Sequence, residues 1–152
     1  VDRAPYFRHP AHVTVNLMKS IATTSVRAAA DAPPYRNEIT AGSHALVADE
    51  PTSAGGRNAG PAPYEYILAG LGACTVMTLT MYAERKGWQL GHIEMDLRLL
   101  KDDDGVTHIE RDLRCSAELS PQQWERLLDI CSKTPVTKTL MAGARIRTRR
   151  SD

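Results

Sequence analysis

The stretch from Gly60 to Trp88 constrains the fold of this chain more than any other part of the sequence. Pro61 and Pro63 suit the entry turn and the first position of a helix, where a missing N–H costs little. Gly87 suits the left-handed position that follows the last helical turn. The pattern therefore predicts one helix of about 24 residues, which is about 36 Å long at 1.5 Å per residue.

The predicted helix combines an apolar stripe with small residues. Helical spacing places five residues on one stripe: Ile67, Leu71, Cys74, Thr78 and Met81. A helical glycine costs about 1 kcal/mol relative to alanine, so Gly70 and Gly72 indicate that another backbone packs close to this helix. Its least polar part, residues 67–79, is shorter than the roughly 20 residues that a membrane span needs. We therefore expect a buried helix and no membrane partner.

Length and charge indicate a single domain without a nucleic-acid partner. The 152 residues include 19 basic and 18 acidic side chains, so no global charge points to nucleic acid. Met18 looks like a native start, and we interpret residues 1–17 as an expression-vector leader and residues 18–152 as the domain. The sequence has no secretory signal, no CxxC pair and no zinc spacing. This predicts a cytoplasmic protein with reduced thiols, no metal and no cofactor.

Short strands are predicted on both sides of the helix. Before it, β-branched residues and a turn at Ala41-Gly42 indicate three strands, over residues 20–28, 35–40 and 43–48. After it, the apolar period changes to two, which indicates a hairpin of residues 93–99 and 106–119 around a turn at 101–105. We expect the aspartates of that turn to face solvent, because the EF-hand pattern is absent. One face of the second strand carries Ile109, Leu113, Cys115 and Ala117, with Cys115 as a small core residue.

The C-terminal third predicts a second helix and a last strand. Ser120 and Gln123 form a capping box, with Leu119 and Trp124 as its hydrophobic staple. Pro135 ends this helix. Residues 143–149 are predicted as a strand with three arginines on its solvent face. The order of elements indicates an α+β domain with helices packed on antiparallel sheet. A 36 Å helix is long for such a small domain, which suggests a two-fold dimer.

The segment VADEP…AGG…GPAPYEYILAGLGACTVMTLTMYAERKGW, residues 47–88, resembles the family of osmotically inducible protein C and organic hydroperoxide resistance protein (OsmC/Ohr). It is most similar to the OsmC-like branch with a DEP…GG…GP-P-E lead-in. The similarity covers residues 36–99 and resumes at KTPVTKTL, residues 133–140. The resemblance implies an OsmC-like fold, in which curved antiparallel sheets pack around long central helices of an intertwined homodimer. It also implies a cofactor-free reduction of organic hydroperoxides in the oxidative stress response.

The resemblance assigns the reactive thiol to Cys74. Its thiolate would attack the peroxide O–O bond, release an alcohol and become a sulfenic acid. A second thiol would then form a disulfide, which an external dithiol reduces. The family's second cysteine precedes a proline, and that position is Thr134 here. Cys131, three residues earlier, is either the resolving thiol or a core residue, and an external thiol is the alternative.

The other helpers of the reaction match the family pattern less well. The peroxidase branch has a glutamate ten residues before its reactive cysteine, where this chain has Tyr64. Glu65 is either a catalytic carboxylate or a partner of the helix dipole. Arg36 and Arg27 are the candidates for the arginine that stabilises the thiolate. The alternative for each is a surface residue without a catalytic role.

Three functions follow from these residues. The leading hypothesis is a homodimeric thiol peroxidase. The alternative is a non-enzymatic member that binds a small apolar ligand in the pocket at the dimer interface. A thiol hydrolase ranks last, because no His or Asp is placed by sequence as a base for Cys74.

Overall fold

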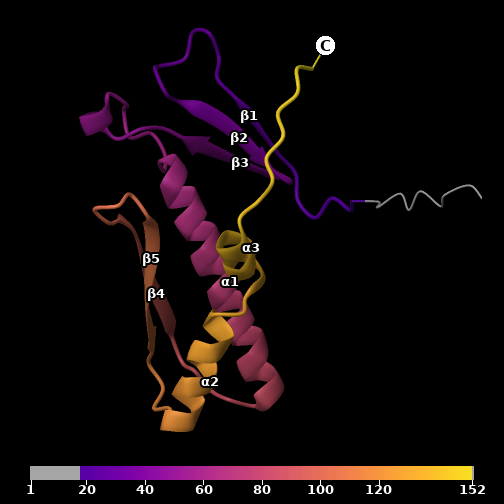
Figure 1. Cartoon of the computed structure of the whole chain (residues 1–152), viewed down its shortest axis with the longest axis vertical. Coiled ribbons are helices and arrows are strands. Elements are labelled where there is room, and N and C mark those ends of the chain that lie inside the picture. Colours follow the sequence, from indigo (N-terminus) through magenta and orange to yellow (C-terminus); the bar gives the residue numbers. More distant parts are fainter. Residues whose placement is uncertain (1–17, 152) are drawn as a thin grey trace, which may run out of the picture.

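The computed structural model describes residues 18–151, so the interpretation of residues 1–17 as a leader lies outside the described residues. The elements are, in order, β1 (Thr24–Arg27), β2 (Asn37–Ala41), β3 (His44–Ala48), a 3₁₀ turn (Thr52–Ala54), α1 (Pro63–Lys86), β4 (Ile93–Lys101), β5 (Thr107–Cys115), α2 (Pro121–Cys131) and α3 (Pro135–Ala142). Two antiparallel sheets form, β1-β2-β3 and β4-β5. The three-stranded sheet lies at the start of α1, and the β4–β5 hairpin lies alongside the helix (Figure 1). The predicted α+β class is confirmed.

Helix α1 begins and ends where the prolines and glycine predict. The Glu65 carboxylate accepts a hydrogen bond from the Ala62 N–H at 2.8 Å. Gly87 takes the left-handed conformation with φ of 65°, and the Trp88 N–H closes the last turn on the Ala83 carbonyl. Local signals therefore fix both ends of the helix.

The predicted apolar stripe of α1 is partly wrong. Of its five members only Leu71 is buried, while Ile67 and Met81 are 41% and 53% exposed. The buried face consists of Leu71, Gly72, Thr75, Leu79 and Ala83. A Cβ atom on Gly72 would lie 2.9 Å from Leu97 Cδ1, so the small residue faces the β4–β5 hairpin. Apolar residues of α1 lie on all sides of the helix, and the close approach of Leu97 at Gly72 determines which side is buried.

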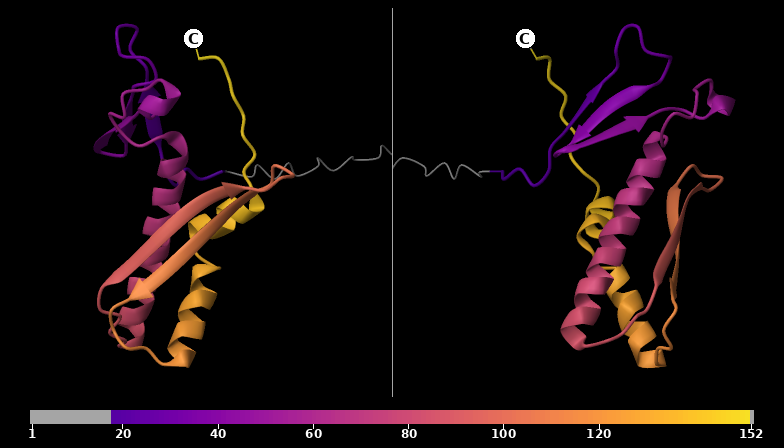
Figure 2. Two further views of the ribbon diagram at one scale, coloured as in Figure 1. Left: turned by 90° about the vertical axis from the view of Figure 1, so that its left-hand side faces the viewer. Right: turned by 180° about the vertical axis from the view of Figure 1, so that it is seen from behind.

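The core lies between the second half of α1, the hairpin and α2. Helix α1 packs against β4, α2 and α3; α2 lies along its second half, and the hairpin runs along most of its length (Figure 2). The buried cluster contains Leu79, Ala83, Leu90, Leu127 and Cys131. Cys115, Leu119 and Trp124 pack against it, as the sequence predicts. The capping box of α2 is confirmed, because Ser120 Oγ accepts from the Gln123 N–H at 3.2 Å and Gln123 Oε1 accepts from the Ser120 N–H at 2.8 Å.

The loop between β3 and α1 is organised by one carboxylate and two glycines. Asp49 is buried, and its side chain accepts hydrogen bonds from the N–H groups of Glu50, Arg57 and Ala59. A Cβ atom on Gly56 would lie 1.9 Å from the Glu50 carbonyl oxygen, and one on Gly60 would lie 2.1 Å from the Val47 carbonyl oxygen. The DEP…GG…GP lead-in therefore has a structural reason, which is close backbone packing around a buried carboxylate.

The three-stranded sheet leaves an apolar surface open. Its predicted hairpin is confirmed, with Ala41 opposite His44 across the turn at Gly42. A pocket of about 430 Å³ lies on one face of this sheet. Its lining includes Val26, Ile39 and Leu46 and, from the start of α1, Pro63 and Tyr66. Val26 is 62% exposed. Within the described chain only the first turn of α1 reaches this surface.

Residues 143–149 do not form the predicted strand. In the described chain, residues 143–151 have no regular secondary structure, and all of them are exposed. The segment runs away from α3 as a single extended chain (Figure 1). Its alternation of arginine with other residues suits a strand, but a strand needs a neighbour for its hydrogen bonds.

The length argument against a membrane span needs a correction. Helix α1 is long and apolar enough to cross a membrane, with a mean hydropathy of 1.5 over 18 residues. The 13 least polar residues are only part of this apolar window, so the predicted span was too short. A core helix passes the same test of length and composition, and one face of α1 packs against β4, α2 and α3, although 28% of the apolar window is buried within this chain.

Candidate functional site

Cys74 lies at the margin between two sides of α1. The thiol is free and half-buried. Its neighbour Thr75 is fully buried and faces the hairpin side. On another side of the helix, Met77 is 64% exposed, and Ile67 and Met81 are exposed as well. The thiol is therefore reachable from solvent, beside apolar side chains that the described chain does not cover.

Cys131 has different surroundings. It is the last residue of α2 and belongs to the buried core cluster. Burial raises the pKa of the Cys131 thiol, the charge of Arg111 opposes that increase, and Cys115 adds to it. Burial also raises the pKa of Cys115. Both core thiols are thus held toward the neutral form, which is the less nucleophilic one. A resolving role for Cys131 stays a prediction.

Thr134 occupies the position of the family's second cysteine, and its hydroxyl belongs to a buried polar network. Thr134 is 1% exposed and is the N-cap residue of α3. Its Oγ1 lies 2.7 Å from Thr137 Oγ1, which in turn lies 3.2 Å from the Cys131 carbonyl oxygen. Arg111 Nη1 donates to Thr75 Oγ1, the Cys131 carbonyl and Thr137 Oγ1 at 3.3, 3.1 and 3.1 Å. This network connects β5 to all three helices.

Sequence reasoning missed Arg111, although a signal was present. Strict alternation along β5 places it on the same face as Ile109 and Leu113, which is the face toward α1. The sequence argument named the apolar residues of that face and passed over the charged one. A cation in the middle of an inward, partly buried strand face is the kind of exception that marks a special position.

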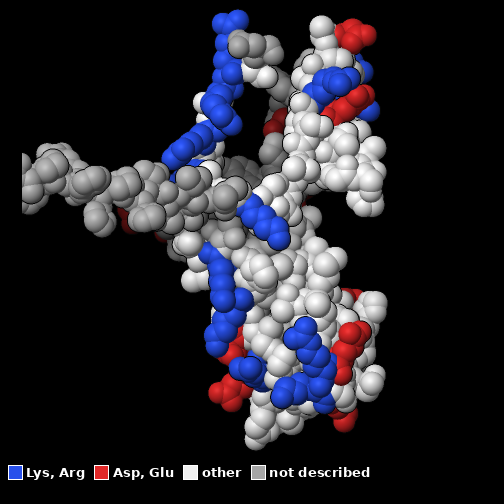
Figure 3. Space-filling model, turned by 90° about the vertical axis from the view of Figure 1, so that its right-hand side faces the viewer, with Lys and Arg blue, Asp and Glu red and all other residues white. Residues whose placement is uncertain are grey.

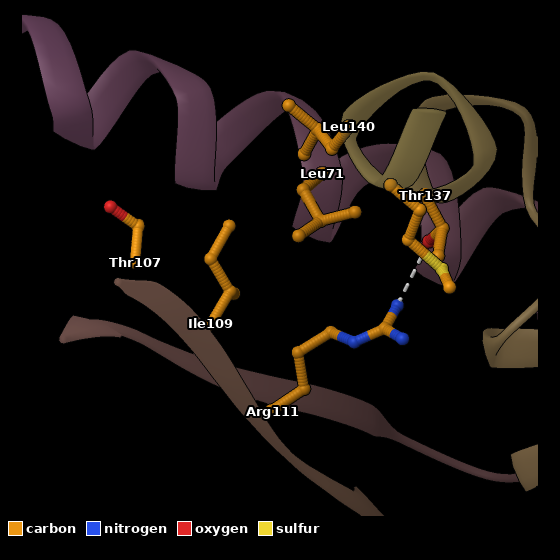
Figure 4. A pocket seen from close by; sticks show the side chains of 7 residues that line it. Leu71, Thr107, Ile109, Arg111, Thr137 and Leu140 are labelled. Atoms are coloured by element: carbon orange, nitrogen blue, oxygen red, sulfur yellow. Dashed lines mark hydrogen bonds between the residues drawn. The ribbon is translucent and has the colours of Figure 1, made fainter. Parts of the chain in front are cut away.

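Arg111 borders a cavity of about 280 Å³ between β5, α1 and α3. Thr107, Arg111 and Thr137 supply its polar lining, and Leu71, Ile109 and Leu140 supply apolar lining. The guanidinium reaches toward Thr137 at one end, Leu71 and Leu140 lie beside Thr137, and Ile109 and Thr107 lie toward the other end (Figure 4). Cys74 does not line this cavity.

The remaining predicted site residues have structural partners. Glu65 is exposed, and its carboxylate caps the start of α1. Nine residues of helix separate it from Cys74, which is about 13 Å along the axis. Arg36 forms an ion pair with Glu38 at 3.6 Å. Arg27 and Tyr64 are exposed. Among residues 18–151, no hydrogen bond joins any of these four side chains to Cys74.

The described residues contain no group of three or more His, Cys, Asp or Glu side chains that could hold a metal ion. The aspartates of the 101–105 turn are used locally instead. Asp102 binds the N–H groups of Asp104 and Val106 and lies 2.7 Å from His108 Nε2. The pKa of Asp102 is lowered by His108 first and by these backbone groups next.

The fold and the free thiol on a central helix define the class of an α+β protein with a helix-borne cysteine. A family model described as OsmC-like protein matches residues 55–149, so the chain belongs to the OsmC-like protein family. This confirms the resemblance seen in the sequence. A search of curated proteins found no match.

Solved structures agree with this fold. An OsmC-like protein from Mycoplasma pneumoniae is 18% identical, with a TM-score of 0.63 over 82% of this chain and 89% of that one. An organic hydroperoxide resistance protein OsmC from Legionella pneumophila is 14% identical, with a TM-score of 0.58 over 80% and 91%. The organic hydroperoxide resistance protein OhrB of Bacillus subtilis is 23% identical, with a TM-score of 0.53 over 78% and 88%. At these identities the likeness establishes the fold.

Proposed function

We propose that this protein is a homodimeric, cytoplasmic thiol peroxidase that reduces organic hydroperoxides, with Cys74 as the nucleophile. The observation that carries the proposal is the position of Cys74, a free and half-exposed thiol at the edge of an apolar helix surface. Two relatives of the same fold are named for resistance to organic hydroperoxides. An apolar surface beside the thiol favours an alkyl hydroperoxide over hydrogen peroxide.

The first chemical step consumes one peroxide and one thiolate. The Cys74 sulfur bonds to the distal peroxide oxygen, the O–O bond breaks, and the alkoxide takes a proton and leaves as an alcohol. The sulfur is oxidised to sulfenic acid and the peroxide is reduced. An external thiol then displaces water from the sulfenic acid, and the second thiol of that dithiol releases Cys74. We assign resolution to an external dithiol because Cys131 is buried and Thr134 has no sulfur.

The homodimer is proposed from surfaces that one chain leaves uncovered. The exposed side of α1 carries Ile67, Met77 and Met81. Nothing lies within 4 Å of a Cβ atom built on Gly70, although a helical glycine suits the close approach of another backbone. The three-stranded sheet exposes a second apolar surface. Figure 3 shows an uncharged area in the middle of one face, bordered by basic side chains. Apolar patches of this kind mark interfaces.

A peroxidase assay tests the proposal. Purified wild-type protein is mixed with cumene hydroperoxide and a dithiol, and peroxide consumption is compared with that of Cys74→Ser and Cys131→Ser. We expect Cys74→Ser to abolish consumption and Cys131→Ser to retain most of it, since the resolving thiol comes from outside. If wild type and Cys74→Ser consume peroxide at the same rate, the enzymatic proposal is wrong.

The non-enzymatic alternative has one specific observation in its favour. In the described chain, no cation makes a hydrogen bond with the Cys74 sulfur, and the family's second cysteine is replaced by Thr134. A thiol without these helpers suits a protein that binds a small apolar ligand at the dimer interface. Equal peroxide consumption by wild type and Cys74→Ser would favour this reading.

A further inference from the structure

Arg111 differs from the arginines on the outer face of the same hairpin. Arg98 pairs with Glu110 and Asp112, and Arg114 pairs with Glu94 and Asp96. Those pairs are exposed, so water also solvates their charges. Arg111 lies on the opposite, inward face, and within residues 18–151 no carboxylate forms an ion pair with it. The inward face therefore carries a positive charge without an anionic partner from the described chain.

Neutral groups satisfy only one part of this guanidinium. All three hydrogen bonds of Arg111 leave from Nη1, and they end on two hydroxyls and one carbonyl. The carbonyl belongs to Cys131 at the C-terminus of α2, where the helix dipole adds partial negative charge. Within the described chain, Nη2 and Nε donate no hydrogen bond. These two groups form one edge of a rigid fork that fits a carboxylate with two parallel hydrogen bonds.

The cavity beside this fork has the shape of a small amphipathic site. Its volume of about 280 Å³ is near the lower limit for pockets that hold small molecules. Arg111 and Thr137 form one polar end, Leu71, Ile109 and Leu140 supply apolar lining, and Thr107 lies at the other end (Figure 4). Inorganic phosphate would leave the apolar part empty, and an alkane or alcohol would leave the guanidinium without a counter-charge.

We propose that this cavity binds a small monocarboxylic acid. Its carboxylate pairs with the guanidinium of Arg111, and its short alkyl chain packs against Leu71, Ile109 and Leu140. Arg111 is partly buried, and a carboxylate would give its guanidinium the anionic partner and the charge-assisted hydrogen bonds that its neutral neighbours do not supply. The site does not depend on the proposed peroxidase activity, because Cys74 does not line the cavity.

Hexanoate and hexan-1-ol test the site as a charged probe and its uncharged match. Calorimetry gives the affinity, and methyl NMR of Leu71, Ile109 and Leu140 gives the place, both without peroxide. We expect hexanoate to bind at least about tenfold more tightly than the alcohol, the margin typical of a charge-assisted hydrogen bond. Arg111→Gln should weaken hexanoate binding by at least that factor. Lys138→Gln, which removes an exposed charge next to Thr137, should leave it unchanged.

A second variant keeps the test decisive if Arg111→Gln fails to fold. Leu140→Trp fills the cavity from α3 at a partly exposed position and leaves the Arg111 hydrogen bonds in place, so it should also remove hexanoate binding. The proposal is overturned by any of four results. These are no hexanoate binding by wild type, equal binding of hexan-1-ol, unchanged binding in the variants of Arg111 or Leu140, and displacement of hexanoate by an equal concentration of inorganic phosphate.

Discussion

The surroundings of Cys74 and Cys131 differ in almost every physical respect. Cys131 lies in a closed region, inside a leucine-rich cluster and beside the Arg111 network, whose guanidinium donates to the Cys131 carbonyl. Cys74 lies beside an open region of exposed methionines and isoleucine on α1. The closed region is complete within one chain, whereas the open region has the character of a surface that expects a partner. The difference teaches that one side of α1 is covered within the chain, whereas Cys74, the proposed nucleophile, lies at the margin of the side that is left open.

The largest expected effect comes from the closed region. Leu127 is fully buried in the cluster around Cys131, so Leu127→Ala removes packing and leaves a cavity. We expect a loss of about 2–5 kcal/mol in the free energy of unfolding. Urea titration followed by circular dichroism measures it. The matched control is the next residue, Leu128, which is exposed, and Leu128→Ala should change stability far less. Equal losses would show that the closed region does not carry the stability.

The polar part of the closed region should contribute less. Thr137→Val keeps the side-chain shape but removes the hydroxyl that bonds Arg111 and contacts Thr134. We expect a loss of about 1–3 kcal/mol, because buried partners are left unsatisfied. Thr139→Val on the same helix removes an exposed hydroxyl that donates to Pro135, and its effect should stay within about 0.5 kcal/mol. If both variants unfold at the same urea concentration, the hydrogen bonds of the network do not contribute to the stability of the fold.

A substitution in the open region should change the affinity of the proposed dimer more than the stability of the folded chain. Met77→Lys places a charge on the exposed apolar side of α1, where the proposed partner chain packs. We expect the dimer dissociation constant to rise at least about tenfold, which corresponds to about 1.4 kcal/mol. Sedimentation equilibrium measures the constant, with Glu84→Lys in the exposed last turn of α1 as the control. An unchanged dissociation constant would show that this side of α1 is not part of the dimer interface.

Local sequence signals predicted most of the fold. The prolines before α1, Gly87 and the Ser120–Gln123 box gave helix ends that the structure confirms, and alternation gave both strands of the hairpin. Pro135 was predicted to end α2, but α2 ends at Cys131 and Pro135 begins α3, which was not predicted as a helix. The buried side of α1 escaped prediction, because its apolar residues lie all around the helix and tertiary contact at Gly72 decides between sides. The predicted strand at residues 143–149 failed because pairing needs a second strand, which no local pattern supplies.

The candidate site was harder to predict than the fold. Only the family resemblance distinguished Cys74 from an ordinary core thiol, since one cysteine on an apolar helix carries no chemical signature. Arg111 was visible as a charge on the inward face of β5, but its hydrogen bonds to three helices depend on how those helices pack. Contacts between distant segments are thus the part that sequence patterns do not contain.

The smallest expected effect is a pH dependence at the base of the open sheet. The N–H of Ala59, followed by those of Glu50 and Arg57 and the charge of Arg36, lowers the pKa of Asp49 below its ordinary value of 3.8, although burial opposes them. A lowered folded-state pKa stabilises the protein above the unfolded value, and this stabilisation is lost as pH falls through the folded value. Wild type should therefore melt several degrees above Asp49→Asn at about pH 6, and the gap should narrow below about pH 4. Differential scanning calorimetry measures both melting temperatures, and a gap that is constant across this range would mean that the Asp49 charge does not hold the loop.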